Sequence, residues 1–251
     1  MPFATARAPR ATRRGPALSL LLGLAVLALA ASPAVAQDDE AVALLQRSAE
    51  TMAGLDSFHF ELTTPRGRTL FLENLELAAL EGDVQRPDRF RASATARAAI
   101  IELNVDVVGV GTRLWITNPM AEGDQYEEID LSAAAGDEGA SISDLLNPDR
   151  VLLQAVEQLQ NPTIAGENEI DGVDATRVDG TVDLSRIQAD GTPVPGLRTD
   201  RPLPASIWID GEGRVLRLEL EGPITTVESS DIVRRLDLSA FNEPVDIQPP
   251  V

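Results

Sequence analysis

Apolar and polar side chains alternate with a period of two along much of this chain, the period of a β-strand with one buried face. The clearest case is residues 101–107, whose odd positions hold isoleucine, leucine or valine and whose even positions hold glutamate, asparagine or aspartate. Further stretches of this character are residues 58–62, 70–77, 86–98, 114–116 and 126–129. We therefore predict many strands, each with one buried face and one face in water.

Two Asp-Gly pairs in the second half of the chain each separate two strand-like stretches, which is a strong signal for a β-hairpin. The predicted hairpins join residues 163–170 to 173–182 and residues 205–210 to 214–221. A last strand is expected over residues 231–238, before a proline-rich tail.

Two segments have apolar residues at three- and four-residue steps instead, which predicts helices. The first covers residues 40–54 and ends at Gly54, a residue typical of helix C-termini. The second covers residues 144–160, where Asn147 and Pro148 separate a short helix from a longer one. The order is helix, many strands, a helical insert and more strands. This order predicts an α+β fold with helices grouped against one face of a large antiparallel sheet.

The first 36 residues have the organisation of a cleavable signal peptide. Four arginines precede an apolar run over residues 17–31, no acidic residue comes before Asp38, and small residues at 34 and 36 suit cleavage before Gln37. The run is shorter than the roughly 20 residues that span a bilayer as a helix. We expect export to the cell envelope or beyond and a single mature domain over residues 37–251. An uncleaved signal anchor is the alternative.

The mature chain is strongly acidic. The whole sequence has a net charge of −19, and loss of the four arginines in residues 1–36 lowers it to −23. Such a charge repels phosphate backbones, so we do not expect nucleic acid as a partner, and it disfavours docking on anionic lipid surfaces. The 251 residues include no cysteine, so disulfides, thiolate metal sites and lipid attachment at a cysteine after the signal peptide are excluded.

Few residue types suited to catalysis are present. His59 is the only histidine, which leaves histidine triads and two-histidine metal sites incomplete, and we interpret it as an ordinary strand residue. Residues 210–213, Asp-Gly-Glu-Gly, resemble part of a calcium loop but lack its bidentate glutamate, so a hairpin turn is predicted there. We expect no catalytic residue, no metal and no cofactor.

Four alanines occupy one face of the predicted strand over residues 91–99. Because packed interiors avoid voids, a bulky helix side chain, a close-packed backbone or something other than protein must fill the space over this face. The third possibility is a cavity, lined by apolar residues of the neighbouring strand and helices. The tentative lining residues are Leu44, Leu45, Ala92, Ala94, Ala96, Ala98, Ile101, Leu103, Val105, Val107, Leu152 and Val156.

Residues 185–204 form the longest segment without periodicity and contain two glycines and four prolines. Loops of this length are often lids or disordered, and both interpretations stay open. An entrance flap predicts that deletion of residues 189–200 alters ligand exchange and leaves the melting curve unchanged.

Several motifs occur in a characteristic order. They are Gly54-Leu55-Asp56-Ser57-Phe58 after the first helix, Asp144-Leu145-Leu146-Asn147-Pro148 followed by Val151-Leu152-Leu153, Ile170-Asp171-Gly172-Val173-Asp174-Ala175, and Ile207-Trp208-Ile209-Asp210 with Arg214-Val215-Leu216-Arg217-Leu218. Their order and spacing resemble the LppX/LprAFG family of cell-envelope lipid-binding proteins, over residues 40 to 248. The resemblance implies a strongly curved antiparallel half-barrel, similar to the LolA/LolB lipoprotein carriers, with helices on the concave face enclosing an apolar cavity for acyl chains.

Members of that family typically carry a lipidated cysteine at the cleavage site, where this chain has Ala36 and Gln37. Anchoring by acylation is therefore not expected for this chain. A freely diffusing carrier and a signal-anchored one both agree with the sequence.

We therefore expect an exported, non-enzymatic carrier or sensor of a lipid or acylated glycolipid, monomeric, which contacts a membrane during transfer. Burial of an acyl chain contributes about 0.8 kcal/mol per methylene before ordering costs. The alternative is an envelope scaffold or stress-sensing module that binds protein through the curved sheet, which a filled core without a cavity would favour. A hydrolase with paired carboxylates comes third and requires two close, buried acids in a cleft.

Overall fold

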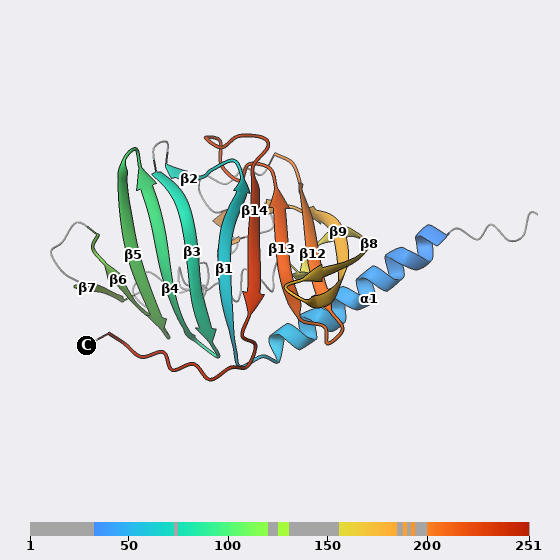
Figure 1. Ribbon diagram of the computed structural model, residues 1–251, viewed down its shortest axis with the longest axis horizontal. Helices are drawn as coiled ribbons and strands as arrows, with labels where there is room; N and C mark the ends of the chain where they lie inside the picture. The colour runs from blue at the N-terminus through green and yellow to red at the C-terminus, as the bar shows by residue number, and fades with distance from the viewer. Residues whose placement is uncertain are drawn as a thin grey trace, which may run out of the picture. The chain divides into compact units, whose positions relative to one another are not determined.

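In the described part of the chain, twelve antiparallel strands form one open sheet (Figure 1). The computed structural model describes residues 33–72, 75–119, 125–130, 156–184, 188–189, 192–193 and 200–250. The chain divides into two compact units, residues 1–36 and 37–251, and the fold below is that of the second unit. The elements are α1 (Pro33–Ala53), β1 (Ser57–Arg66), β2 (Thr69–Leu72), β3 (Leu75–Gln85), β4 (Arg89–Ala98), β5 (Ile101–Val110), β6 (Arg113–Thr117), β7 (Tyr126–Asp130), β8 (Gln160–Ile170), β9 (Val173–Val182), β10 (Gln188–Ala189), β11 (Thr192–Pro193), β12 (Leu203–Asp210), β13 (Val215–Glu221) and β14 (Val233–Ser239).

The strand order in the sheet is β7-β6-β5-β4-β3-β1-β14-β13-β12-β9-β8, with β2 paired to β3. The first and last strands of the chain meet at the centre, because β1 pairs with both β3 and β14. Both predicted Asp-Gly hairpins are confirmed as β8–β9 and β12–β13. The antiparallel α+β fold predicted from the sequence is therefore present.

Strand β3 is the main difference from the expected strands. It continues to Gln85, whereas the alternation in the sequence ends at Leu77. A bulge between Leu77 and Ala79 interrupts the register with β4, and an irregularity of this kind shifts the side chains that follow it. The strand was missed because its apolar residues change their spacing at the bulge.

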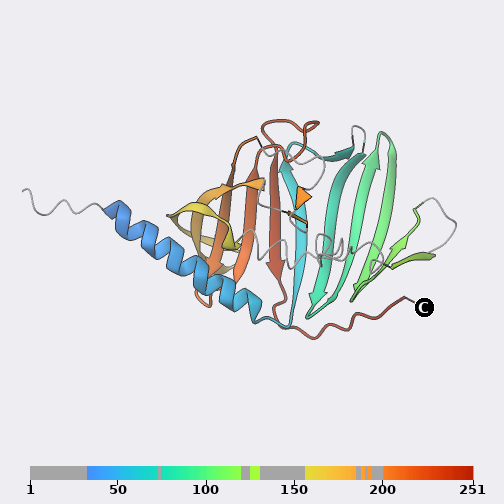
Figure 2. The same cartoon turned by 180° about the vertical axis from the view of Figure 1, so that it is seen from behind.

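Helix α1 lies across β9, β12 and β13 and packs on one face of the sheet (Figure 2). It begins at Pro33 rather than near residue 40, and its buried residues Ala41, Leu44, Leu45 and Met52 follow the helical spacing predicted from the sequence. We call the face that contacts α1 the inner face and the opposite one the outer face.

More than one helix was expected on this face. Among the described residues α1 is the one long helix, and of the predicted helical insert 144–160 only residues 156–160 are described, with residues 156–157 helical. An enclosed cavity beneath several helices stays a prediction.

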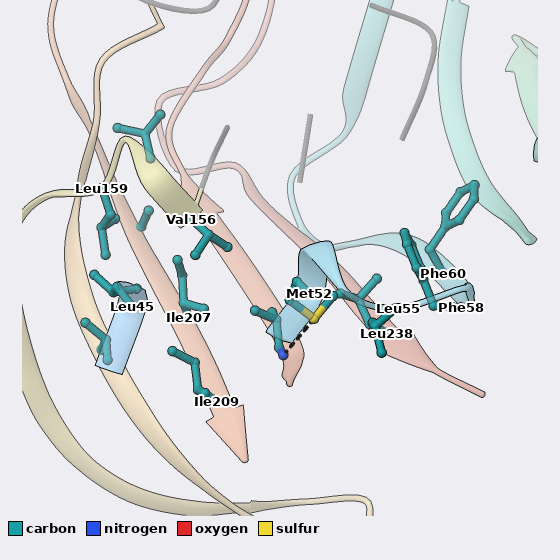
Figure 3. Close-up of a cluster of buried hydrophobic side chains, with 14 of the residues drawn as sticks. Leu45, Met52, Leu55, Phe58, Phe60, Val156, Leu159, Ile207, Ile209 and Leu238 are labelled. Carbon is teal, nitrogen blue, oxygen red and sulfur yellow. Dashed lines mark hydrogen bonds between the residues drawn. The ribbon is translucent and has the colours of Figure 1, made fainter. Parts of the chain in front are cut away.

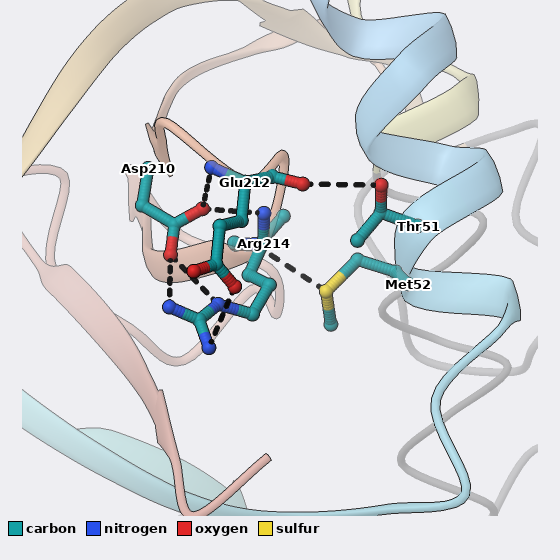
Figure 4. A network of polar contacts seen from close by, with 6 residues as sticks. Thr51, Met52, Asp210, Glu212 and Arg214 are labelled. Carbon is teal, nitrogen blue, oxygen red and sulfur yellow. Dashed lines mark hydrogen bonds and ion pairs between the residues drawn. The ribbon is translucent and has the colours of Figure 1, made fainter. Parts of the chain in front are cut away.

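The end of α1 is fixed to the turn between β12 and β13 (Figure 4). The Asp210 carboxylate accepts hydrogen bonds from the backbone N–H groups of Glu212 and Arg214, at 3.0 and 2.8 Å. The Val215 N–H points to Met52 Sδ at 3.3 Å, and Thr51 Oγ1 donates to the Glu212 carbonyl at 3.4 Å. The predicted hairpin turn over residues 210–213 is confirmed, and it positions the helix.

The irregular segment predicted over residues 185–204 is shorter at its end, because β12 begins at Leu203. Within it, β10 and β11, of two residues each, pair antiparallel. The remaining residues, 185–187, 190–191 and 194–199, lie outside the described part of the chain, so its role as a flap stays a prediction.

The proline-rich C-terminal segment has no regular structure but is attached to the start of the sheet. Asn242 accepts a hydrogen bond from the Asp56 N–H at 2.7 Å through its side-chain oxygen. Ile247 is 2% exposed, and its backbone bonds to the side chains of Gln85 and Arg89. These contacts close one end of the sheet at β1, β3 and β4.

Gly213 offers a test of the contact between α1 and the β12–β13 turn. Its φ of +88° is strained for other residues, and a Cβ atom there would lie 2.8 Å from Thr51 Oγ1. We expect Gly213→Ala to lower the free energy of unfolding by about 2 kcal/mol, measured by urea denaturation. Gly211→Ala is the matched control, since a Cβ at Gly211 meets nothing within 4 Å, and a change within about 0.5 kcal/mol is expected. Equal stability of both variants would contradict this view of the turn.

Candidate functional site

The inner face is apolar across nearly the whole sheet. Residues opposite one another in antiparallel strands share a face, and the pairings of Ala92 with Val107, Ala94 with Val105, Ala96 with Leu103 and Ala98 with Ile101 place all eight residues on one side. Phe60 is opposite both Gly82 and Leu238, which continues the same face through β3, β1 and β14. The predicted residues of β4 and β5 therefore do form one surface.

This surface is unevenly covered along the strands. Towards the end where β1 begins and β4 begins, which we call the lower end, Phe58, Phe60, Val84, Phe90 and Leu114 are all buried. A Cβ atom at Gly82 or Gly109 would overlap the rings of Phe60 and Phe90, so these two glycines make room for the aromatic side chains. The lower end of the inner face is filled with protein.

The opposite end, which we call the upper end, lies at the top of Figure 1. There Ala94, Ala96, Ala98, Leu103 and Val105 are only half-buried, and Ile101 is 57% exposed. The sequence predicted a buried face for this strand, and that expectation is wrong in degree. An alternating pattern identifies the apolar face of a strand, but burial depends on what other elements cover it.

The predicted lining residues of the helical segments lie in a second place. Leu44, Leu45 and Val156 are buried in the main core against β9 and β12, where Leu159 and Ile207 join them (Figure 3). Ala92 and Val107 pack at the edge of the same core. Leu152 lies outside the described residues. The predicted residues thus form two adjoining groups, one beneath α1 and one on the half-buried face of β4 and β5.

A pocket of about 380 Å³ lies between α1 and the segment that precedes β8. Leu45, Ala49, Val156 and Leu159 supply its apolar wall, and Val42 at its edge is 41% exposed. Apolar pockets with a few polar residues at the rim are typical of sites for small hydrophobic ligands. It offers additional apolar surface next to α1.

An ion pair missed by the sequence analysis lies at the upper end. Arg234 occupies an inner position of β14, opposite Leu220, and is buried in an ion pair with Glu228. Glu228 also accepts N–H groups of Leu70, Ile224 and Thr225, so it holds the loop between β13 and β14. The sequence did contain a sign of this pair, because Arg234 shares the alternating positions of apolar Leu236 and Leu238.

Polar residues of the outer face bind one another. The Nδ1 atom of His59 lies 2.8 Å from the Asp83 carboxylate, whose other oxygen accepts a bond from Arg91 at 2.7 Å. They line a polar groove of about 370 Å³ with Glu81 and Asp106. The prediction that His59 is an ordinary strand residue agrees with this arrangement.

Within the described ranges, no group of three or more histidine, cysteine, aspartate or glutamate side chains is placed to hold a metal ion. No helix in the same part of the chain is long and apolar enough to cross a membrane.

The pKa of Asp83 is lowered from its ordinary value of 3.8. Partial burial raises the pKa of this carboxyl group, but hydrogen bonds from His59 and Arg91, together with the charges of both, lower it by more. Because the folded-state pKa is depressed, the carboxylate stabilises the fold above about pH 4, and this contribution is lost as the pH falls through the folded-state pKa.

Asp83→Asn tests this electrostatic contribution. We expect the variant to lose about 1 kcal/mol of unfolding free energy at pH 7, and the difference from the parent to shrink as the pH is lowered below about 4. Chemical denaturation at several pH values measures both. Glu102→Gln is the control. Glu102 forms an ion pair with Arg97 in which both side chains are 54% exposed, so this variant should change stability by under about 0.5 kcal/mol. A difference for Asp83→Asn that is the same at all pH values would contradict the account.

Comparison with known proteins gives matches over nearly the whole second unit. The model of the LppX_LprAFG lipoprotein family matches residues 40–247. The lipoarabinomannan carrier protein LprG of Mycolicibacterium smegmatis is 26% identical over 210 residues, 80% of this chain and 82% of LprG. The putative diacylated glycolipid transporter LprF of Mycobacterium bovis is 29% identical over 174 residues, 68% of this chain and 62% of LprF.

Two solved structures have the same fold. The crystal structure of LprF from Mycobacterium bovis matches with a TM-score of 0.59 and 22% identity, over 84% of this chain and 97% of that one. The structure of the Mycobacterium tuberculosis lipoprotein LppX matches with a TM-score of 0.57 and 21% identity, over 84% of this chain and 100% of that one. These likenesses show that the chain has the fold of LprF and LppX.

Proposed function

Because the chain belongs to the LppX_LprAFG lipoprotein family, we propose that it is an exported, non-enzymatic carrier or sensor that holds a lipid or acylated glycolipid on the inner face of its sheet. LprG and LprF, to which it is similar, are named as a lipoarabinomannan carrier and a glycolipid transporter. The proposal concerns the transport of such a molecule within the cell envelope.

The observation that carries the proposal is the half-buried apolar surface on the upper part of β4 and β5. Leu103 and Val105 are apolar and partly open to solvent, and the residues opposite them in β4 are alanines, whose side chains are small. Each methylene buried on such a surface contributes about 0.8 kcal/mol, so an acyl chain of ordinary length has ample binding energy to offset its ordering. An acyl chain also needs no polar partner, which suits a face made of hydrocarbon.

No catalytic step belongs to the proposal. The single histidine is bonded to Asp83 on the outer face, on the opposite side of the sheet from the proposed ligand. The proposed role requires binding and release alone, without a cofactor.

Cleavage before Gln37 is part of the proposal, and the division of the chain into units 1–36 and 37–251 supports it. Helix α1 starts at Pro33, so cleavage removes its first four residues and leaves the buried residues from Ala41 onwards in the mature protein. The sequence contains no cysteine, so a lipid anchor on cysteine does not form part of the proposed function, although the family is one of lipoproteins.

Filling the space over the alanines tests the proposed site. We expect Ala94→Phe to reduce binding of a fluorescent diacyl lipid by about tenfold or more, because the added ring occupies the position of several acyl methylenes. Equilibrium fluorescence titration measures the affinity. Ala96→Leu is a smaller change with the same expected direction, and it serves if the bulkier side chain impairs folding.

Thr95→Phe is the matched control, since Thr95 lies between these alanines on the outer face and bonds to Asn104 there. It should retain binding within about twofold, because a side chain on the outer face does not reach the ligand. A folded Ala94→Phe variant with unchanged affinity, or a parent protein that binds no acyl probe, would overturn the proposed function.

A further inference from the structure

The turn between β4 and β5 exposes two adjacent isoleucines. Ile100 is 99% exposed and Ile101 is 57% exposed, and they are the two most exposed of the large apolar side chains in the described residues. Single exposed apolar residues are common on protein surfaces. Here Ala98 and Ala99 precede the isoleucines, so the whole tip of the hairpin is hydrocarbon.

The composition of this turn is unusual for its geometry. Two-residue hairpin turns require positive φ angles, which favour glycine, asparagine and aspartate. Two comparable turns in the same sheet have such residues, Gly111-Thr112 between β5 and β6 and Asp171-Gly172 between β8 and β9. The β4–β5 turn has Ala99 at a φ of 55°, followed by a β-branched isoleucine. Neither turn chemistry nor solubility accounts for these residues, which points to a contact made outside the folded chain.

The tip continues directly into the proposed ligand site. Ile101 is opposite Ala98 on the inner face, at the upper end where Ala94, Ala96, Leu103 and Val105 are half-buried. The loop between β13 and β14 lies at the same upper end of the sheet, and its residue Val227 is 41% exposed. An apolar path therefore runs from the tip to the half-buried face.

We propose that the β4–β5 tip, Ala99 to Ile101, inserts into the apolar region of a lipid bilayer without net surface charge and thereby places the open end of the inner face against the membrane. The inference rests on the proposed function for its purpose, which is passage of the acylated ligand between bilayer and protein. Membrane insertion itself is a separate property and is measured without a ligand.

The charges near the tip and on the whole domain select the kind of bilayer. Next to the tip, Arg97 and Glu102 pair at 3.1 Å, so these two side chains together add no net charge beside the inserted residues. Residues 37–251 carry a net charge of −23, which anionic bilayers repel. Attraction by hydrocarbon therefore exceeds repulsion only where the surface charge is low or screened by salt.

The test is partitioning of residues 37–251 onto vesicles, measured by flotation. Phosphatidylcholine vesicles should bind the parent, and phosphatidylglycerol vesicles should bind it more weakly at low salt. The double variant Ile100→Asn/Ile101→Thr should bind phosphatidylcholine vesicles about tenfold or more weakly. Its fold should be intact, because asparagine suits the turn and threonine suits a strand. Ile100→Leu, which retains an apolar tip, should bind like the parent.

Val173→Ser is the matched control, because Val173 is 40% exposed beside a two-residue turn at the lower end of the sheet. It should bind vesicles like the parent. The proposal is overturned if the parent does not float, if the tip variant floats equally well, or if Val173→Ser loses as much binding. It is also overturned if sedimentation shows that the parent is a dimer and the tip variant a monomer, since a second copy would then cover the isoleucines.

The two proposals fail separately in these experiments. The single variant Ile100→Asn separates them, because it leaves Ile101 on the inner face unchanged. Parental affinity for the dispersed acyl probe, combined with slower uptake of the probe from vesicles, supports both proposals. Loss of probe binding in the parent contradicts the proposed function alone, because flotation reports the membrane contact directly.

Discussion

Packing of a single described helix against part of a wide apolar sheet is the constraint on which the structure depends. Met52 and Thr51 fix the end of α1 to the β12–β13 turn, and Leu44 and Leu45 bury the helix against β9 and β12. The inner face continues with the same apolar character through β1, β3, β4 and β5, where these contacts do not reach. Exposed apolar surface costs about 25 cal/mol per Å² relative to burial, and the proposed acyl chain would remove part of this cost by covering it.

Other parts of the protein cover the lower end of that surface more fully than the upper end, so the two ends of the proposed site differ. Phe58, Phe60 and Phe90 close the lower end, and the C-terminal segment fastens the strands there through Ile247. The upper end has smaller side chains, the loop held by Glu228, and the exposed tip at Ile100. An acyl chain bound on this face would have its methyl end near the phenylalanines and its polar end at the opening. The proposed membrane contact lies at the same end, so in this proposal binding and transfer would share one path.

The sequence predicts the faces of the strands better than it predicts their surroundings. Alternation placed Leu103 and Val105 on the same side as Ala94 and Ala96, and the pairing of β4 with β5 confirms it. Their partial exposure was not predictable, because cover comes from segments distant in the chain. Most of β3 was not predicted, because the bulge after Leu77 interrupts the alternation of its side chains. Arg234 was also missed, since its partner Glu228 lies in a loop without periodicity. Leu44 and Val156 belong to the neighbouring core beneath α1 rather than to the alanine face.

Mass spectrometry of organic extracts from protein purified from its own host without detergent is the most direct test of a lipid on the inner face. We expect an acylated molecule in a molar amount close to that of the protein, lost from the Ala94→Phe variant and retained by Thr95→Phe. Folded parent protein whose extracts contain no acylated molecule, and which takes up none from host lipids, would contradict the claim that a lipid completes the inner face.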